Sequence, residues 1–115
     1  MKLKVKITPA QYAELITVIE ALDYNNIPVS NIELINLKYF WREGKPKCTD
    51  FIFKKLPMNK VRGFTIDVNH YEALKTVLGF EGIKVSPYTL SVLETLKRGA
   101  ELQIMREVSA YRFIG

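Results

Sequence analysis

Basic side chains crowd the middle of this 115-residue sequence and are its most chemically specific feature. The segment from Lys38 to Arg62 holds eight basic and two acidic residues, a net charge of +6, whereas the rest of the chain sums to −1. Concentrated positive charge attracts polyanions, and the attraction weakens with salt. We therefore predict contact with nucleic acid or another polyanion through this segment. The predicted contact residues are Lys38, Tyr39, Arg42, Lys45, Lys47, Lys54, Lys55, Lys60 and Arg62.

Two other interpretations of the basic segment stay open. The lysines also suit a solvated loop or hairpin that they keep soluble. Alternatively, the segment docks on an acidic protein partner. In that case the chain is a structural or assembly protein that acts by protein–protein contact or self-association, including homo-oligomer formation.

Aromatic residues interleave with this charge. Tyr39, Phe40 and Trp41 lie between Lys38 and Arg42, a combination that nucleic-acid-binding proteins use for stacking and backbone contact. On a helix, Trp41 falls on the apolar side and is expected in the core. Tyr39 falls on the polar side and is the better stacking candidate.

Other chemistry finds little support in the residues. His70, the one histidine, aligns with Gln11 in an internal repeat and is expected at a capping or surface position. No histidine–cysteine cluster has the spacing of a zinc site, and the six glycines are too dispersed for a phosphate loop. Lys45 and Lys47 would lower the pKa of Cys48 if they lie close to it, yet no base stands nearby in sequence. We predict no catalytic residue, metal or cofactor, and hence no enzyme.

Two stretches of the chain resemble each other. Val5–Ile19 aligns without a gap to Phe64–Leu78, with five identities in 15 positions. After a three-residue deletion, Val29–Leu37 aligns to Val85–Leu93 with four identities. The sequence therefore predicts an internal pseudo-repeat, residues 1–56 and 60–115, within a single domain spanning 1–115.

Each half is predicted to begin with a strand that runs straight into a helix. In Lys2–Ile7 the aliphatic side chains face inward and the lysines outward, and Val61–Ile66 is the counterpart. Thr8 with Gln11 forms a capping box for the first helix, and Asp67 caps its equivalent.

A second helix and a closing strand are predicted to follow in each half. Ser30 opens one such helix, which Gly44 stops, and Ser86 opens the other, which Gly99 interrupts. The closing strands are predicted over Asp50–Lys54 and Ala110–Ile114.

Residues 31–43 also fit a strand pattern. Apolar side chains alternate with polar ones from Ile35 to Trp41, and residues 43–47 would then be a hairpin loop before a strand over 49–55. We favour the helix because of its cap and its counterpart. The hairpin would instead turn the basic segment into a projecting ribbon suited to nucleic acid.

The predicted fold class is α+β. Two similar β-α-α-β halves would form a small mixed or antiparallel sheet covered by helices, with a ferredoxin-like fold as a variant. The apolar runs are too short to span a bilayer, and the N-terminus lacks the apolar core of a signal peptide. Together with the single cysteine, these features predict a cytoplasmic protein without a membrane partner.

Overall fold

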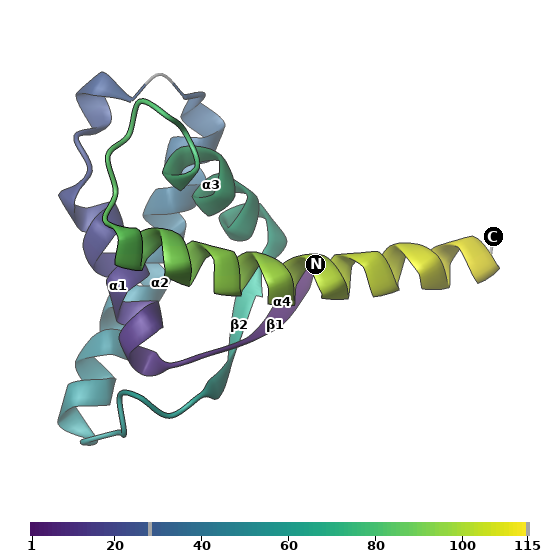
Figure 1. Cartoon of the computed structure of the whole chain (residues 1–115), viewed down its shortest axis with the longest axis horizontal. Coiled ribbons are helices and arrows are strands. Elements are labelled where there is room, and N and C mark those ends of the chain that lie inside the picture. Colours follow the sequence, from purple (N-terminus) through teal and green to yellow (C-terminus); the bar gives the residue numbers. More distant parts are fainter. Residues whose placement is uncertain (28, 115) are drawn as a thin grey trace.

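The chain folds as a two-stranded antiparallel sheet with four α-helices around it (Figure 1). The computed structural model describes residues 1–27 and 29–114, with side chains described as far as residue 109. Its elements are β1 (Lys2–Ile7), α1 (Pro9–Ala21), a 3₁₀ turn (Tyr24–Asn26), α2 (Asn31–Phe53), β2 (Arg62–Asp67), α3 (Val68–Leu78) and α4 (Pro87–Ile114). The α+β class is therefore confirmed.

The two strands pair along their full length, with Val5 opposite Phe64 at the centre of the register. Leu3, Val5 and Ile7 are buried, while the lysines between them are exposed. The predicted inner and outer faces of β1 are thus confirmed. Burial of alternate side chains fixes this register, because a slip of one residue would turn the apolar face outward.

Capping boxes start the first two long helices. The hydroxyl of Thr8 accepts a hydrogen bond from the Gln11 amide (3.1 Å), and the Gln11 side chain accepts one from the Thr8 amide (2.9 Å). Ser30 and Glu33 form the same reciprocal pair at the start of α2. The helical interpretation of residues 31–43 is therefore confirmed, and the hairpin alternative is wrong.

Helix α2 does not stop at Gly44, contrary to the prediction. Gly44 is buried against Tyr12 and Ile16 of α1, so its missing side chain allows close helix packing. The helix also continues through Pro46, although proline lacks the amide that would bond the carbonyl four residues earlier. Burial of Phe51, one to two turns further on, favours continuing the helix across these residues.

The two predicted closing strands are wrong. Asp50–Phe53 belongs to α2, and residues 110–114 are helical and belong to α4. A strand would have turned Phe51 and Phe53 to one face, whereas the helix buries Phe51 and leaves Phe53 86% exposed. Gly99 likewise lies inside a continuous α4 and does not interrupt it.

The order strand–helix–helix occurs twice, but the structure does not show two similar β-α-α-β halves. A ferredoxin-like sheet needs four strands, and the described residues form two. The two stretches that resemble each other in sequence are therefore not shown to form two similar structural units.

Aromatic rings join the sheet to α1 and α2. Tyr12 stacks on Phe64 with ring centroids 4.6 Å apart and also meets Phe40 and Phe51 edge-on or tilted. All four side chains are buried. This cluster fixes the position of α2 relative to β2, and therefore of the basic residues that these two elements carry.

Helix α4 crosses the molecule beside β1 and then projects beyond it (Figure 1). Its first half is anchored by buried Val92, Leu96 and Ala100. Leu102, Met105 and Val108, further along, are about half exposed or more. Among the described residues, no helix has the length and apolar character needed to cross a membrane.

Candidate nucleic-acid interface

The structure does not bring the predicted basic residues into one patch. All eight are exposed, but those on α2 lie on two flanks of the helix. At 100° per residue, Lys38, Arg42 and Lys45 share one flank, and Lys47 and Lys54 lie about 160° away on the other. Nearness in sequence therefore overstates nearness in space here.

The flank with Lys38, Arg42 and Lys45 is partly occupied by contacts within the chain. Lys45 forms a 3.0 Å ion pair with Glu20 of α1. The Arg42 guanidinium lies 5.7 Å from the centroid of the Tyr39 ring, which is half exposed. Tyr39 thus already has a cationic neighbour on the helix that carries it.

The other flank faces β2 across an open groove of about 320 Å³. Lys47 and Lys54 lie on the helix side of this groove and Arg62 lies on the strand side, with Phe51 and Phe64 also lining it. Asp50 is the acidic residue among its lining residues, 3.9 Å from Lys54 in an exposed pair. An exposed pair of this kind contributes little to stability and leaves Lys54 accessible.

Lys55 and Lys60 do not line this groove. Lys55 follows the last turn of α2 and has a φ of 52°, the left-handed conformation that often ends helices. Lys60 is exposed in the connection to β2. Their positive charge near the carboxyl end of α2 is also favourable for the helix dipole.

The outer face of the sheet adds cations that the predicted set did not include. Lys2, Lys4 and Lys6 project from β1 opposite Asp67, Thr65 and Gly63 of β2. Lys2 forms a 3.6 Å ion pair with Asp67.

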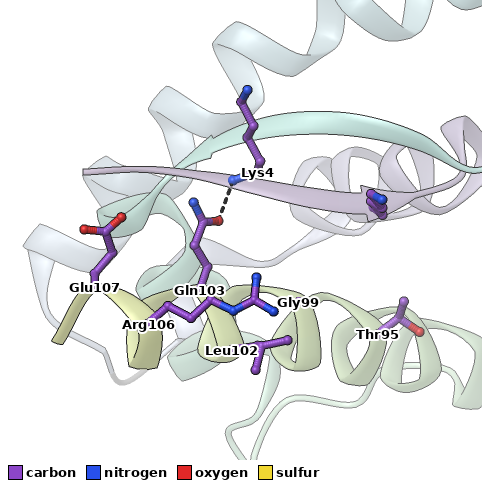
Figure 2. Close-up of a pocket in the computed structure, with 8 residues that line it drawn as sticks. Lys4, Thr95, Gly99, Leu102, Gln103, Arg106 and Glu107 are labelled. Carbon is purple, nitrogen blue, oxygen red and sulfur yellow. Dashed lines mark hydrogen bonds between the residues drawn. The ribbon is translucent and has the colours of Figure 1, made fainter. Parts of the chain in front are cut away.

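A larger groove of about 630 Å³ lies between β1 and α4, and the Lys4 side chain extends from β1 away from α4 (Figure 2). Gln103 reaches from α4 to β1, where its Oε1 accepts a hydrogen bond from the Lys4 amide (2.7 Å). Gly99 of α4 also faces β1, and a Cβ at this position would lie in ordinary van der Waals contact with the Val5 side chain, 3.9 Å away. Arg106 and Glu107 lie one turn further along the groove.

The two grooves flank the sheet, one between β1 and α4 and the other between β2 and α2. Lys4 is opposite Thr65, and Lys6 is opposite Gly63, so residues of one groove are paired with residues of the other. Paired strands lie about 4.8 Å apart. Lys4 and Lys6 project from the outer face of the sheet, whereas Arg62 is paired with buried Ile7 and the Lys47 amine lies 5.9 Å from the centroid of the Tyr12 ring. Five cations that line the two grooves have no carboxylate within ion-pair distance in the described part of the chain. They are Lys4, Lys6, Lys47, Arg62 and Arg106. We call them the sheet cations.

The contact residues predicted from the sequence do not include Lys4, Lys6 or Arg106. The outward lysines of β1 were visible as an alternating pattern, but Arg106 is a hundred residues away from Lys6 along the chain. Only the packing of α4 against β1 brings them together, and no sequence spacing encodes it.

Asp67 links this surface to the stability of α3. Its carboxylate accepts a hydrogen bond from the Asn69 amide (2.8 Å) as the N-cap of the helix. That bond, followed by the charges of His70 and Lys2, lowers the pKa of Asp67 below its ordinary 3.8. Because the carboxylate is favoured in the folded state, its contribution is present above pH 4 and is lost as the pH falls through the lowered pKa.

We predict that Asp67→Ala lowers the free energy of unfolding by about 1 kcal/mol near pH 7. The difference from the wild-type protein should shrink well below pH 3.8, as the pH falls through the lowered pKa and the wild-type carboxylate is protonated. Urea denaturation at the two pH values measures this. Asp67→Ser, which keeps a capping oxygen but cannot ionise, is the control and should lose less at pH 7. A deficit of Asp67→Ala that is the same at both pH values would contradict the role of the carboxylate charge.

His70 and Cys48 differ from their sequence-based expectations. His70 is 93% buried on α3, with Nδ1 4.0 Å from Glu43, and so does not lie on the surface. Burial raises the pKa of the Cys48 thiol, and the opposing effect of Lys45 is smaller. No three His, Cys, Asp or Glu side chains in the described residues gather closely enough to hold a metal ion.

No protein-family model, no curated protein and no solved structure matches this chain.

Proposed function

We propose that the chain is a non-catalytic module that binds nucleic acid through its phosphate backbone, across the two grooves that flank the sheet. The observation that carries the proposal is that the five sheet cations, from β1, α2, β2 and α4, line two grooves beside the paired strands of one sheet. None is neutralised by an ion pair within the described residues. Unneutralised cations on one surface are what a polyphosphate requires.

The residue types on this surface favour backbone contact over base recognition. The outward positions of the two strands carry lysines, Gly63, Thr65 and Asp67, and hold no aromatic ring on which a base could stack. Lysine and arginine contacts to phosphates position a protein on nucleic acid without specifying sequence. We therefore expect weak dependence on base sequence.

The proposed interface differs from the segment singled out by sequence. It retains Lys47 and Arg62, with Lys54 beside them, and adds the cations of β1 and α4. Lys38, Arg42 and Lys45 lie on the other flank of α2 and are left out.

Binding to fluorescent duplex DNA and duplex RNA across a salt series tests the proposal. With five sheet cations, the logarithm of the association constant should fall against the logarithm of salt with a slope of roughly −3 to −5. Duplexes of unrelated sequence should bind within a few-fold of each other. Absence of binding at low salt, or binding that does not respond to salt, would overturn the proposal.

Assembly by self-association is the second candidate, and the exposed stripe of Leu102, Met105 and Val108 favours it. These residues lie on the projecting half of α4 (Figure 1), where a second copy of the same helix would cover them. Light scattering over a range of concentrations separates the candidates. A strict monomer that binds duplexes supports the nucleic-acid role alone.

A further inference from the structure

The backbone of β2 has one side that faces no strand. Within the described residues the sheet ends at β2, whereas the corresponding side of β1 is met by Gln103 of α4. An unpaired strand edge offers a row of donors and acceptors to an incoming chain.

The direction of the Lys4 backbone amide shows which residues of β2 direct their N–H and C=O groups to the unpaired side. Two residues opposite each other in an antiparallel pair either exchange two backbone hydrogen bonds, or direct their N–H and C=O groups away from each other. The Lys4 amide donates to Gln103, away from β2, so Lys4 and Thr65 form a pair of the second kind. Two residues along the strand, Lys6 and Gly63 form another. The N–H and C=O groups of Gly63 and Thr65 therefore point to the free side of β2.

These four backbone groups have no hydrogen-bond partner among the described residues. Natural edge strands are commonly protected by charged residues or proline in their centre. The central residues of β2, Gly63–Ile66, include neither. This edge is therefore open to pairing.

The groove beside the edge determines what kind of chain fits. Lys47, Lys54 and Arg62 surround it, with Asp50 as the opposing charge among its lining residues, and Phe51 and Phe64 supply apolar surface. A second copy meeting this one edge to edge would bring two such cationic clusters together, which costs free energy. A strand with carboxylates would instead be attracted to them.

We propose that the free edge of β2 binds an extended acidic segment of another protein, which adds to the sheet as a third strand. Backbone bonds to Gly63 and Thr65 supply the pairing, and the cations around the groove select carboxylate side chains. This proposal goes beyond nucleic-acid binding and rests on the direction of backbone groups, which the phosphate contacts do not use.

The test uses fluorescent peptides of about eight residues in which valine alternates with glutamate or, as the control, with lysine. The glutamate peptide should bind at least about tenfold more tightly at low salt. The backbone nitrogens can be methylated at either the odd-numbered or the even-numbered residues of the peptide. Because alternate N–H groups of a strand point to opposite sides, only one of these two patterns blocks the hydrogen bonds to β2. One methylated peptide should lose binding by about tenfold or more, and the other should not. Equal effects of the two patterns, or equal binding of the two charge types, would overturn the proposal.

Thr65→Pro provides the matching change in the protein. It removes the outward N–H at the centre of the edge, a position where a strand tolerates proline. Glutamate-peptide binding should weaken about tenfold, while Thr65→Val, which keeps the N–H, should bind as the wild type does. Duplex binding by Thr65→Pro should persist, so failure of the peptide proposal is distinguishable from failure of the nucleic-acid proposal. If Thr65→Pro binds the peptide like wild type, or if it fails to fold while both methylated peptides bind equally to wild type, the third strand is excluded.

Discussion

The double variant Lys4→Glu/Lys6→Glu should bind duplex nucleic acid about 100-fold more weakly than the wild-type protein at low salt. Both side chains project from the outer face of β1 and lie beside the groove that also holds Arg106. Each reversal removes an attraction to phosphate and adds a repulsion, at a cost of roughly 1.4 kcal/mol or more. The salt dependence should also become shallower, since fewer counterions are released on binding. Fluorescence anisotropy titrations at several salt concentrations measure both effects.

The variant Lys38→Glu/Lys45→Glu is the matched control. It changes the net charge by the same amount but on the other flank of α2, where Lys45 is already paired with Glu20 at 3.0 Å. We expect its affinity to fall by less than about tenfold, through long-range electrostatics alone. Equal losses in the two variants would mean that net charge, and not the sheet surface, governs binding. Circular dichroism and thermal unfolding check that both variants fold.

Replacing Gly44 with leucine should lower the free energy of unfolding by about 3 kcal/mol. A Cβ at this position would lie 2.8 Å from the Tyr12 hydroxyl oxygen and closer still to the side chain of Ile16. Tyr12 and Ile16 are both almost completely buried, so neither has free space to move into. Helix propensity alone predicts the opposite, a gain of nearly 1 kcal/mol on removing a helical glycine. The sign of the effect therefore tests whether α2 packs on α1 at this point.

Gly63→Ala is the control for the glycine substitution. No atom lies within 4 Å of a Cβ built at Gly63, and the backbone there does not adopt a positive φ. Its free energy of unfolding should stay within about 0.5 kcal/mol of wild type. Urea denaturation of the two variants gives the comparison. A Gly44→Leu protein at least as stable as wild type would contradict the close contact of α1 and α2.

Local sequence signals predicted the beginnings of elements well. The pairs Thr8/Gln11 and Ser30/Glu33 are complete within a four-residue window, and each forms the capping box that its residues specify. The alternation in Lys2–Ile7 likewise specified a half-buried strand. Such signals act between neighbours in the chain, so they are legible without the fold.

The ends of elements depended on contacts that the sequence does not display. Gly44, Pro46 and Gly99 all favour ending a helix, yet α2 and α4 continue through them. Phe51 explains why α2 continues past Gly44 and Pro46, because its ring reaches those of Tyr12 and Phe64 only if the helix persists. Tertiary burial here outweighs a local preference of a few kcal/mol.

The sequence by itself determined the composition, the excess of positive charge and the buried face of β1, because these depend on residue type and local periodicity. Only the tertiary structure decided which cations are neighbours. Helix rotation of 100° per residue separates Lys45 from Lys47 although they are two positions apart. Packing of α4 against β1 brings Lys6 and Arg106 to one groove although a hundred positions of the chain divide them. Charge acts through space, so a surface for an anion is a property of the fold and not of a segment.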